Sequence, residues 1–148
     1  MDAYILIGNA NTRKTSVVRS LTGCFNRSVR DIQLQGSDRS VRFYARVGAL
    51  QTTRTTLDEF LAEVARSRCE AVVFCLAPHA HKTDLQEYPD AQTYVAGLRE
   101  RGWTIKGVAV MGQDGGGVQA TNQRQYTQAP AAPLNATARD VRAQFGWV

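Results

Sequence analysis

The spacing of apolar and polar positions changes repeatedly along the chain, and these changes predict its secondary structure. Short apolar runs typical of strands lie at residues 4–7, 70–76 and 103–111. Apolar positions with helical spacing lie at residues 17–21, 57–64, 91–98 and 141–145. Strands that alternate with helices are typical of an α/β domain built around a mostly parallel sheet. We therefore expect one three-layer α/β domain over residues 1–148, a length sufficient for a substantial core.

Two further strands are expected between the first and second helices. Residues 27–34 alternate partly between apolar and polar, residues 36–38 are a polar turn, and residues 41–47 form a second strand-like run. Two strands joined by a short polar turn predict a hairpin, which would give the sheet one antiparallel edge strand. The run at 71–76 is apolar on both faces, as expected of a central strand covered by helices.

Capping residues predict where several helices begin. Thr56 with Glu59 forms a capping box, Asp90 can cap the next helix, and Thr137 can cap the last one. Residues 112–136 are rich in Gly, Gln, Ala, Thr and Pro and have no apolar period. We expect this segment to be a long flexible loop without regular structure, a type of connection that is often functional.

Composition narrows the range of partners and compartments. The net charge of +5 is compatible with a phosphate-bearing partner, but no run of basic residues favours nucleic acid, and a protein partner stays open. No stretch has the length of a transmembrane helix and no leader pattern is present, so we expect no membrane association and a cytoplasmic localisation. The three cysteines have no C-x-x-C pair, which favours reduced, buried thiols.

The strongest chemical signal is the segment G-N-A-N-T-R-K-T, which follows the first strand and opens the first helix. It matches the phosphate-loop pattern G-x-x-x-x-G-K-[ST] except at Arg13, where the pattern has its second glycine. Backbone N–H groups in such a loop, with the positive end of the helix dipole, can bind an anion. The predicted phosphate-binding residues are Gly8, Asn9, Ala10, Asn11, Thr12, Arg13, Lys14, Thr15 and Ser16.

Within this loop, Lys14 would contact the terminal phosphates, and the hydroxyl of Thr15 (or Ser16) would ligate Mg²⁺. Arg13 leaves two interpretations open. Its guanidinium could donate hydrogen bonds to a phosphate, or its bulk could narrow the site that glycine would leave open. A simple strand–turn–helix with a solvated Arg13–Lys14 pair is the non-functional alternative.

The segment G-N-A-N-T-R-K-T-S-V-V-R-S-L-T-G (8–23) resembles the first motif of P-loop GTPases of the translation-factor type. Those loops often read G-N-x-N-x-G-K-[ST]-S and continue to a leucine and then T-G. The resemblance covers this segment and is much weaker beyond it. It implies a fold of the P-loop NTPase superfamily, GTPase-like and with a degenerate Walker A motif, that binds GTP or ATP with Mg²⁺.

Acidic residues expected of such a GTPase are missing. The D-x-x-G motif would follow the strand at 41–47, where the chain reads R-V-G-A-L, and the strand at 71–76 ends in L-A-P without a Walker B acid. Asp58 or Glu59 could replace that acid, although the capping box already explains Glu59. Without the acid, Mg²⁺ and the attacking water lose an anchor, so we do not expect efficient hydrolysis and leave enzymatic activity open.

Loops at the carboxyl ends of parallel strands meet at one edge of the sheet, where ligands bind. We expect this edge to gather residues 8–15, 48–56, 78–83 and 112–117. Asp114 follows the strand that ends at Met111 and could accept a hydrogen bond from a guanine base, although a turn residue before three glycines is the favoured interpretation. His79 and His81 could bind a metal with Cys75 or Asp84, but an H-x-H pair alone favours ordinary loop residues.

Two classes of function follow. The first is a nucleotide-binding P-loop protein with weak or no hydrolysis that acts as a switch or scaffold, supported by Lys14 with Thr15. The second is a non-enzymatic interaction module on a degenerate P-loop fold that no longer binds nucleotide, supported by Arg13 and by the missing acid.

Overall fold

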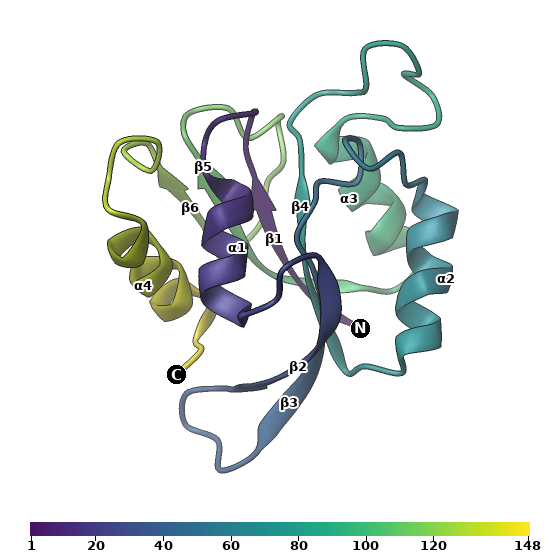
Figure 1. The fold of residues 1–148 in the computed structure, drawn as a ribbon. Helices are drawn as coiled ribbons and strands as arrows, with labels where there is room; N and C mark the ends of the chain where they lie inside the picture. The colour runs from purple at the N-terminus through teal and green to yellow at the C-terminus, as the bar shows by residue number, and fades with distance from the viewer.

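The computed structural model describes all residues 1–148 and contains one six-stranded mixed sheet with four helices (Figure 1). The strands are β1 (Asp2–Ile7), β2 (Arg27–Gln33), β3 (Ser40–Arg46), β4 (Ala71–Leu76), β5 (Thr104–Met111) and β6 (Gln123–Tyr126). The helices are α1 (Lys14–Thr22), α2 (Leu57–Ser67), α3 (Ala91–Glu100) and α4 (Leu134–Phe145). The predicted α/β class is therefore confirmed.

The strand order is β2-β3-β4-β1-β5-β6. Every neighbouring pair is parallel except β2 and β3, which form the predicted antiparallel hairpin at one edge. All six residues of β4 are buried, and β4 lies between β3 and β1. The prediction of a central strand at 71–76 is confirmed, because only a strand covered on both faces can bury every side chain.

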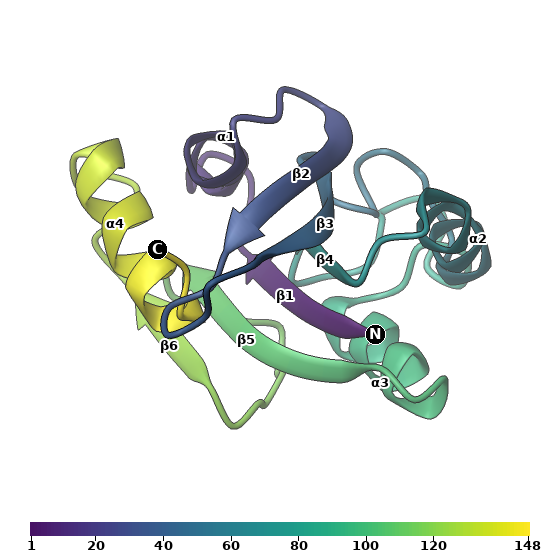
Figure 2. The same cartoon turned by 90° about the horizontal axis from the view of Figure 1, so that it is seen from below.

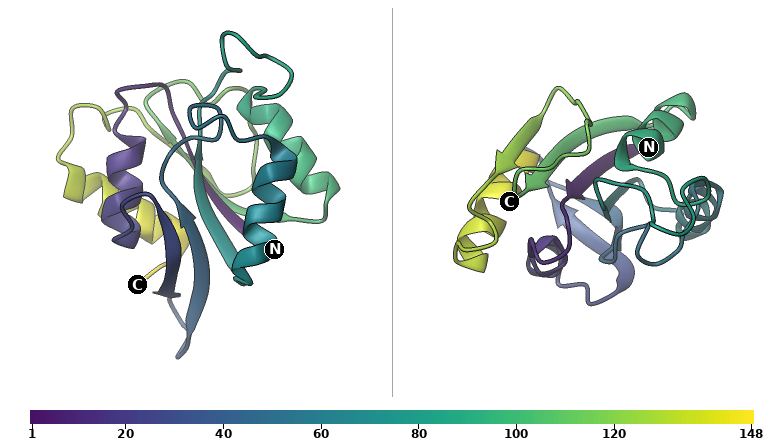
Figure 3. Two further views of the ribbon diagram at one scale, coloured as in Figure 1. Left: turned by 45° about the vertical axis from the view of Figure 1, so that its right-hand side comes forward. Right: turned by 90° about the horizontal axis from the view of Figure 1, so that it is seen from above.

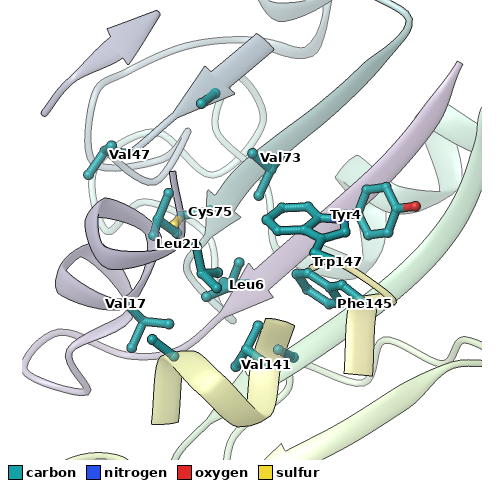
Figure 4. Close-up of a cluster of buried hydrophobic side chains, with 14 of the residues drawn as sticks. Tyr4, Leu6, Val17, Leu21, Val47, Val73, Cys75, Val141, Phe145 and Trp147 are labelled. Atoms are coloured by element: carbon teal, nitrogen blue, oxygen red, sulfur yellow. The ribbon is translucent and has the colours of Figure 1, made fainter. Parts of the chain in front are cut away.

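Two helices cover each face of the sheet (Figure 2). Helices α1 and α4 pack on one face, and α2 and α3 pack on the other. The side chains of β1 alternate between these faces: Tyr4 and Leu6 join the core under α1 and α4, whereas Ile5 and Ile7 join the core under α2 and α3. Figure 4 shows the first core, where Tyr4 lies close to Phe145 and Trp147.

This topology has a switch point at the carboxyl end of β1. Helix α1 leaves β1 on one face toward the β2 edge, whereas α3 leaves β4 on the other face and crosses β1 to reach β5. The connections that follow the adjacent strands β1 and β4 therefore run in opposite directions. Such a point is where open α/β sheets bind ligands. The right panel of Figure 3 looks down on this edge.

Two of the predicted helix caps are confirmed and one is wrong. Thr56 and Glu59 form a reciprocal capping box, and Asp90 accepts a hydrogen bond from the Thr93 backbone N–H. Helix α4 instead begins at Leu134, directly after Pro133, so Thr137 lies inside the first turn and is buried. The Pro133 carbonyl oxygen accepts hydrogen bonds from the backbone N–H groups of Ala136 (3.1 Å) and Thr137 (3.2 Å), so the first turn is already formed when the chain reaches Thr137.

The segment 112–136 is not free of regular structure, contrary to the sequence-based expectation. It contains strand β6, which pairs in parallel with β5 from Val108↔Gln123 to Met111↔Tyr126, and it includes the start of α4. As an edge strand, β6 buries only Tyr126 and exposes its three other residues. A strand with one neighbour and one buried side chain has no apolar period to recognise.

No helix in the protein combines the length and apolar character needed to span a bilayer.

Candidate functional site

The site begins with the tight loop between β1 and α1. Its first residue, Gly8, is buried, and a Cβ at this position would lie 2.5 Å from Thr12 Oγ1 and 3.0 Å from the Met111 carbonyl oxygen. Thr12 Oγ1 in turn donates a hydrogen bond of 2.7 Å to the Asn9 carbonyl oxygen. A side chain at position 8 would therefore crowd both Thr12 in the loop and the backbone at the end of β5.

Two residues of this loop have left-handed backbone conformations. Asn11 and Arg13 both have φ near +68°, and Arg13 is the N-cap residue of α1. Asparagine tolerates this region, but for other L-residues it costs about 1–2 kcal/mol. The position at which the motif has glycine therefore has the backbone conformation that glycine adopts most easily, and here arginine occupies it.

The Arg13 side chain extends to another part of the chain. Its Nη1 donates a hydrogen bond of 2.8 Å to the carbonyl oxygen of Ala132, which precedes α4. Ala132 lines a different hollow from the one beside the loop. The guanidinium is therefore held at the segment before α4.

The backbone N–H groups of this region lack partners within the protein. None of the amides from residues 9 to 16 donates a hydrogen bond, and the first amide of α1 that does is that of Val17, to the Arg13 carbonyl oxygen at 2.9 Å. The N-cap side chain gives no hydrogen bond, and the first turn of α1 has no acidic residue. The positive end of the helix is therefore not compensated by the protein itself.

Lys14 is buried next to these amides, with 8% of its surface exposed. Its Nζ makes one long hydrogen bond, 3.4 Å to the Asn9 carbonyl oxygen, and it has no carboxylate within ion-pair distance. Burial lowers the pKa of Lys14 because it disfavours the charged form. An ammonium group can donate three hydrogen bonds, so most of its capacity is unused.

A cavity of about 560 Å³, here called the loop cavity, lies against Lys14. Eight of the nine predicted phosphate-binding residues line it, Asn9 to Ser16, whereas Gly8 is buried and does not line it. The other lining residues come from the segments after β3 and β4 and are Gly48, Ala49, Thr52 and Ala77. No carboxylate is among them. The hydroxyls of Thr15 and Ser16 make no hydrogen bond in the protein and are available to a ligand or to Mg²⁺.

Gln51 does not line the loop cavity, but it holds Ala77, which does. It is 2% exposed, its Nε2 donates to the carbonyl oxygens of Ala77 (2.8 Å) and Pro89 (3.0 Å), and its Oε1 accepts from the Ala77 N–H (2.9 Å). This clamp joins the segments that follow β3 and β4. Sequence reasoning missed it, because a lone glutamine in a predicted loop has no pattern that distinguishes it.

Asp114 joins two neighbouring loops outside the loop cavity. Its Oδ1 accepts a hydrogen bond from the Gly116 N–H at 2.9 Å, and its Oδ2 lies 2.5 Å from His79 Nε2. The Gly116 hydrogen bond and the His79 contact lower the pKa of the Asp114 carboxyl. The two loops touch closely, because a Cβ at Gly116 would lie 2.4 Å from the Pro78 carbonyl oxygen. Asp114 thus organises a turn, as the favoured interpretation of the sequence expects.

The other candidate side chains do not form a second centre. No group of three His, Cys, Asp or Glu residues is placed to hold a metal ion, so His79 and His81 are not part of such a cluster. The Cys75 thiol is fully buried, and burial raises its pKa to about 12. Glu59 is occupied in its capping box, and Asp58 lies at the surface, 3.4 Å from Arg101. Neither acid lines the loop cavity.

A scan against protein-family models matches none, and searches of curated proteins and of solved structures find no match either.

Proposed function

We propose that this chain binds the phosphate groups of a nucleoside triphosphate, GTP or ATP, in the loop cavity between β1 and α1. The observation that carries the proposal is the state of Lys14, which is 8% exposed, has no carboxylate partner and makes one hydrogen bond of 3.4 Å. A fold of the P-loop NTPase type accounts for this arrangement, with Arg13 as a departure from its motif.

The energetics of Lys14 support an anionic ligand. Burying an ammonium group without a partner is costly, and a phosphate beside it would recover this cost through charge-assisted hydrogen bonds. The amides of residues 9 to 16 would supply further donors, because none of them has a partner in the protein. A volume of about 560 Å³ also lies within the range of small-molecule sites, roughly 300–1,000 Å³.

The residues of the loop cavity fit Mg²⁺ only in part. The hydroxyls of Thr15 and Ser16 would contribute ligands, and Mg²⁺ would supply charge neutralisation of the phosphates. No carboxylate lines the cavity to anchor the metal or to orient a water molecule. We therefore propose weak or no hydrolysis, and a role as a switch or scaffold.

Thermal unfolding with and without nucleotide tests the proposal. Wild type and Lys14→Met are compared in the presence of Mg²⁺ with GTP, GDP or ATP. Lys106→Met, at an exposed position near the start of β5, is the control. A nucleotide at a hundred times its dissociation constant should stabilise the wild type by about 2.7 kcal/mol. The same nucleotide-induced stabilisation is expected in Lys106→Met and none in Lys14→Met. If no nucleotide stabilises the wild type, the proposal is wrong.

A second candidate is an interaction module that has lost nucleotide and uses the same edge of the sheet for a protein partner. The hydrogen bond from Arg13 to Ala132 favours this second candidate. Arg13 stands where the motif has a glycine, and its side chain is held by the protein itself and not by a ligand. The same unfolding experiment separates the two candidates.

A further inference from the structure

A second, larger cavity lies next to the loop cavity, between the β2–β3 edge and α2. It has a volume of about 690 Å³, and Ala62 is its one hydrophobic lining residue. Gly48 lines both cavities, so the segment after β3 separates them. We call it the arginine cavity after the four arginines that line it, Arg27, Arg46, Arg54 and Arg66.

Its wall is built around a buried arginine. Arg46 is 5% exposed, and its guanidinium donates to Glu63 Oε2 (2.9 Å) and to the hydroxyls of Thr53 (2.8 Å) and Thr55 (2.6 Å). The other oxygen of Glu63 lies 3.2 Å from Arg27 Nη1 and accepts a hydrogen bond from the Tyr44 hydroxyl. This network holds Arg46 in a single position and leaves Glu63 with no capacity for a cationic guest.

The remaining charges of the arginine cavity are not balanced. Its second carboxylate, Glu59, is occupied by its capping box with Thr56. Arg54 and Arg66 make neither an ion pair nor a side-chain hydrogen bond within the protein. Four arginines against two glutamates give the walls a formal charge of +2 (4 − 2). Guanidinium groups in this setting match the geometry of phosphate and carboxylate groups.

We propose that the arginine cavity binds a small anion that carries a phosphate or a carboxylate group. Arg54 and Arg66 would contact the anion directly, and the buried Arg46 would add fixed positive charge from the wall. The proposal goes beyond nucleotide binding and does not depend on it. If both cavities are filled, the two ligands are separated by only the segment from Gly48 to Thr53.

Nuclear magnetic resonance of the complete chain tests this site. Inorganic phosphate and malonate are titrated separately while the Nε–Hε signals of the arginines are followed. The Lys14→Met variant is titrated in parallel, because it removes the cation of the loop cavity. We expect at least one anion to shift the Arg54 and Arg66 signals with the same midpoint in wild type and in Lys14→Met. The anion with the lower midpoint identifies the preferred head group.

The double variant Arg54→Gln/Arg66→Gln should bind that anion roughly tenfold more weakly, since it loses two charge-assisted contacts. Its binding is followed through the signals of Arg27 and Arg46, which also line the cavity and remain in the variant. The side chains of Arg54 and Arg66 are exposed, so an unchanged thermal midpoint without ligand is expected. Arg139→Gln is the matched control: it is an exposed arginine on α4, on the opposite face of the sheet, and pairs only with Asp140.

Three results would overturn the site. They are no arginine shift with either anion, shifts that disappear in Lys14→Met, or an anion-titration midpoint in the double variant equal to that of the wild type. None of them affects the nucleotide proposal, which is judged by nucleotide-induced stabilisation and by its loss in Lys14→Met. Conversely, a chain that binds no nucleotide can still bind an anion at Arg54 and Arg66.

Discussion

The Arg13 guanidinium donates a 2.8 Å hydrogen bond to the carbonyl oxygen of Ala132, a residue 119 positions later in the chain. The backbone of Arg13 meanwhile has the left-handed conformation, with φ of 68°. Arg13, where the phosphate-loop pattern has a glycine, thus has a backbone conformation that glycine adopts most easily, and its side chain extends to the segment before α4. Arg13 is accommodated by a contact that is distant in sequence.

This relationship predicts the effect of Arg13→Gly. Glycine would adopt the same φ without the steric cost and would let a phosphate approach the backbone more closely, so nucleotide affinity should rise by roughly threefold. Isothermal titration calorimetry of wild type and Arg13→Gly measures this change in nucleotide affinity. A loss of affinity of that size would instead identify the guanidinium as a phosphate ligand.

Lys14→Met should stabilise the protein when no ligand is present. The variant replaces a buried, unpaired ammonium group with an apolar side chain of similar length, and changes of this class commonly gain about 1 kcal/mol. The free energy of unfolding in urea measures the gain, and Lys106→Met, an exposed control, should show none. Destabilisation by Lys14→Met would mean that the ammonium has a stabilising role in the unliganded protein.

The difference in free energy of unfolding between Lys14→Met and wild type should depend on pH. Burial lowers the pKa of Lys14 in the folded state below the 10.5 of an unperturbed lysine. At a pH between the pKa of folded Lys14 and that of the unfolded chain, the unfolded state binds more protons than the folded state. The contribution of Lys14 to stability therefore rises with pH. The advantage of Lys14→Met in free energy of unfolding should therefore be largest near neutral pH and narrow as the pH approaches 10.5. An advantage that stays constant over this range would contradict the assigned burial.

Much of the fold could be predicted because the relevant signals are local. The fully apolar run at 71–76 indicated a central strand, and Thr56 with Glu59 indicated the start of α2, both as observed. The phosphate-loop spacing also predicted a helix that opens at Lys14, and α1 begins there.

The features that were missed depend on contacts that are distant in sequence. Strand β6 exists because β5 offers it a free edge, and its own residues are polar. Gln51 holds Ala77, a lining residue of the loop cavity, and Pro89 through their backbone carbonyl oxygens, 26 and 38 residues away. The hydrogen bond between Arg13 and Ala132 spans almost the whole chain. No local pattern of residues records such pairs.

The network around Glu63 predicts a large loss of stability in Glu63→Ala. The variant would leave the buried Arg46 without its carboxylate, and breaking a buried pair in this way costs about 3–5 kcal/mol. Chemical denaturation measures the change, with Asp58→Ala as the control. Asp58 pairs with Arg101 at the surface, and its loss should cost less than about 1 kcal/mol. Similar costs for the two variants would show that the Arg46–Glu63 pair is screened by solvent.

The central claim is that Lys14 and the unpartnered amides of residues 9 to 16 bind the phosphates of a nucleotide. Amide resonances of these residues, followed while GTP or ATP with Mg²⁺ is added to the complete chain, test it directly. We predict that these amides shift and exchange more slowly with solvent at saturation, and that Lys14→Met abolishes both effects. Unchanged amides from 9 to 16 with either nucleotide at millimolar concentration would contradict the account.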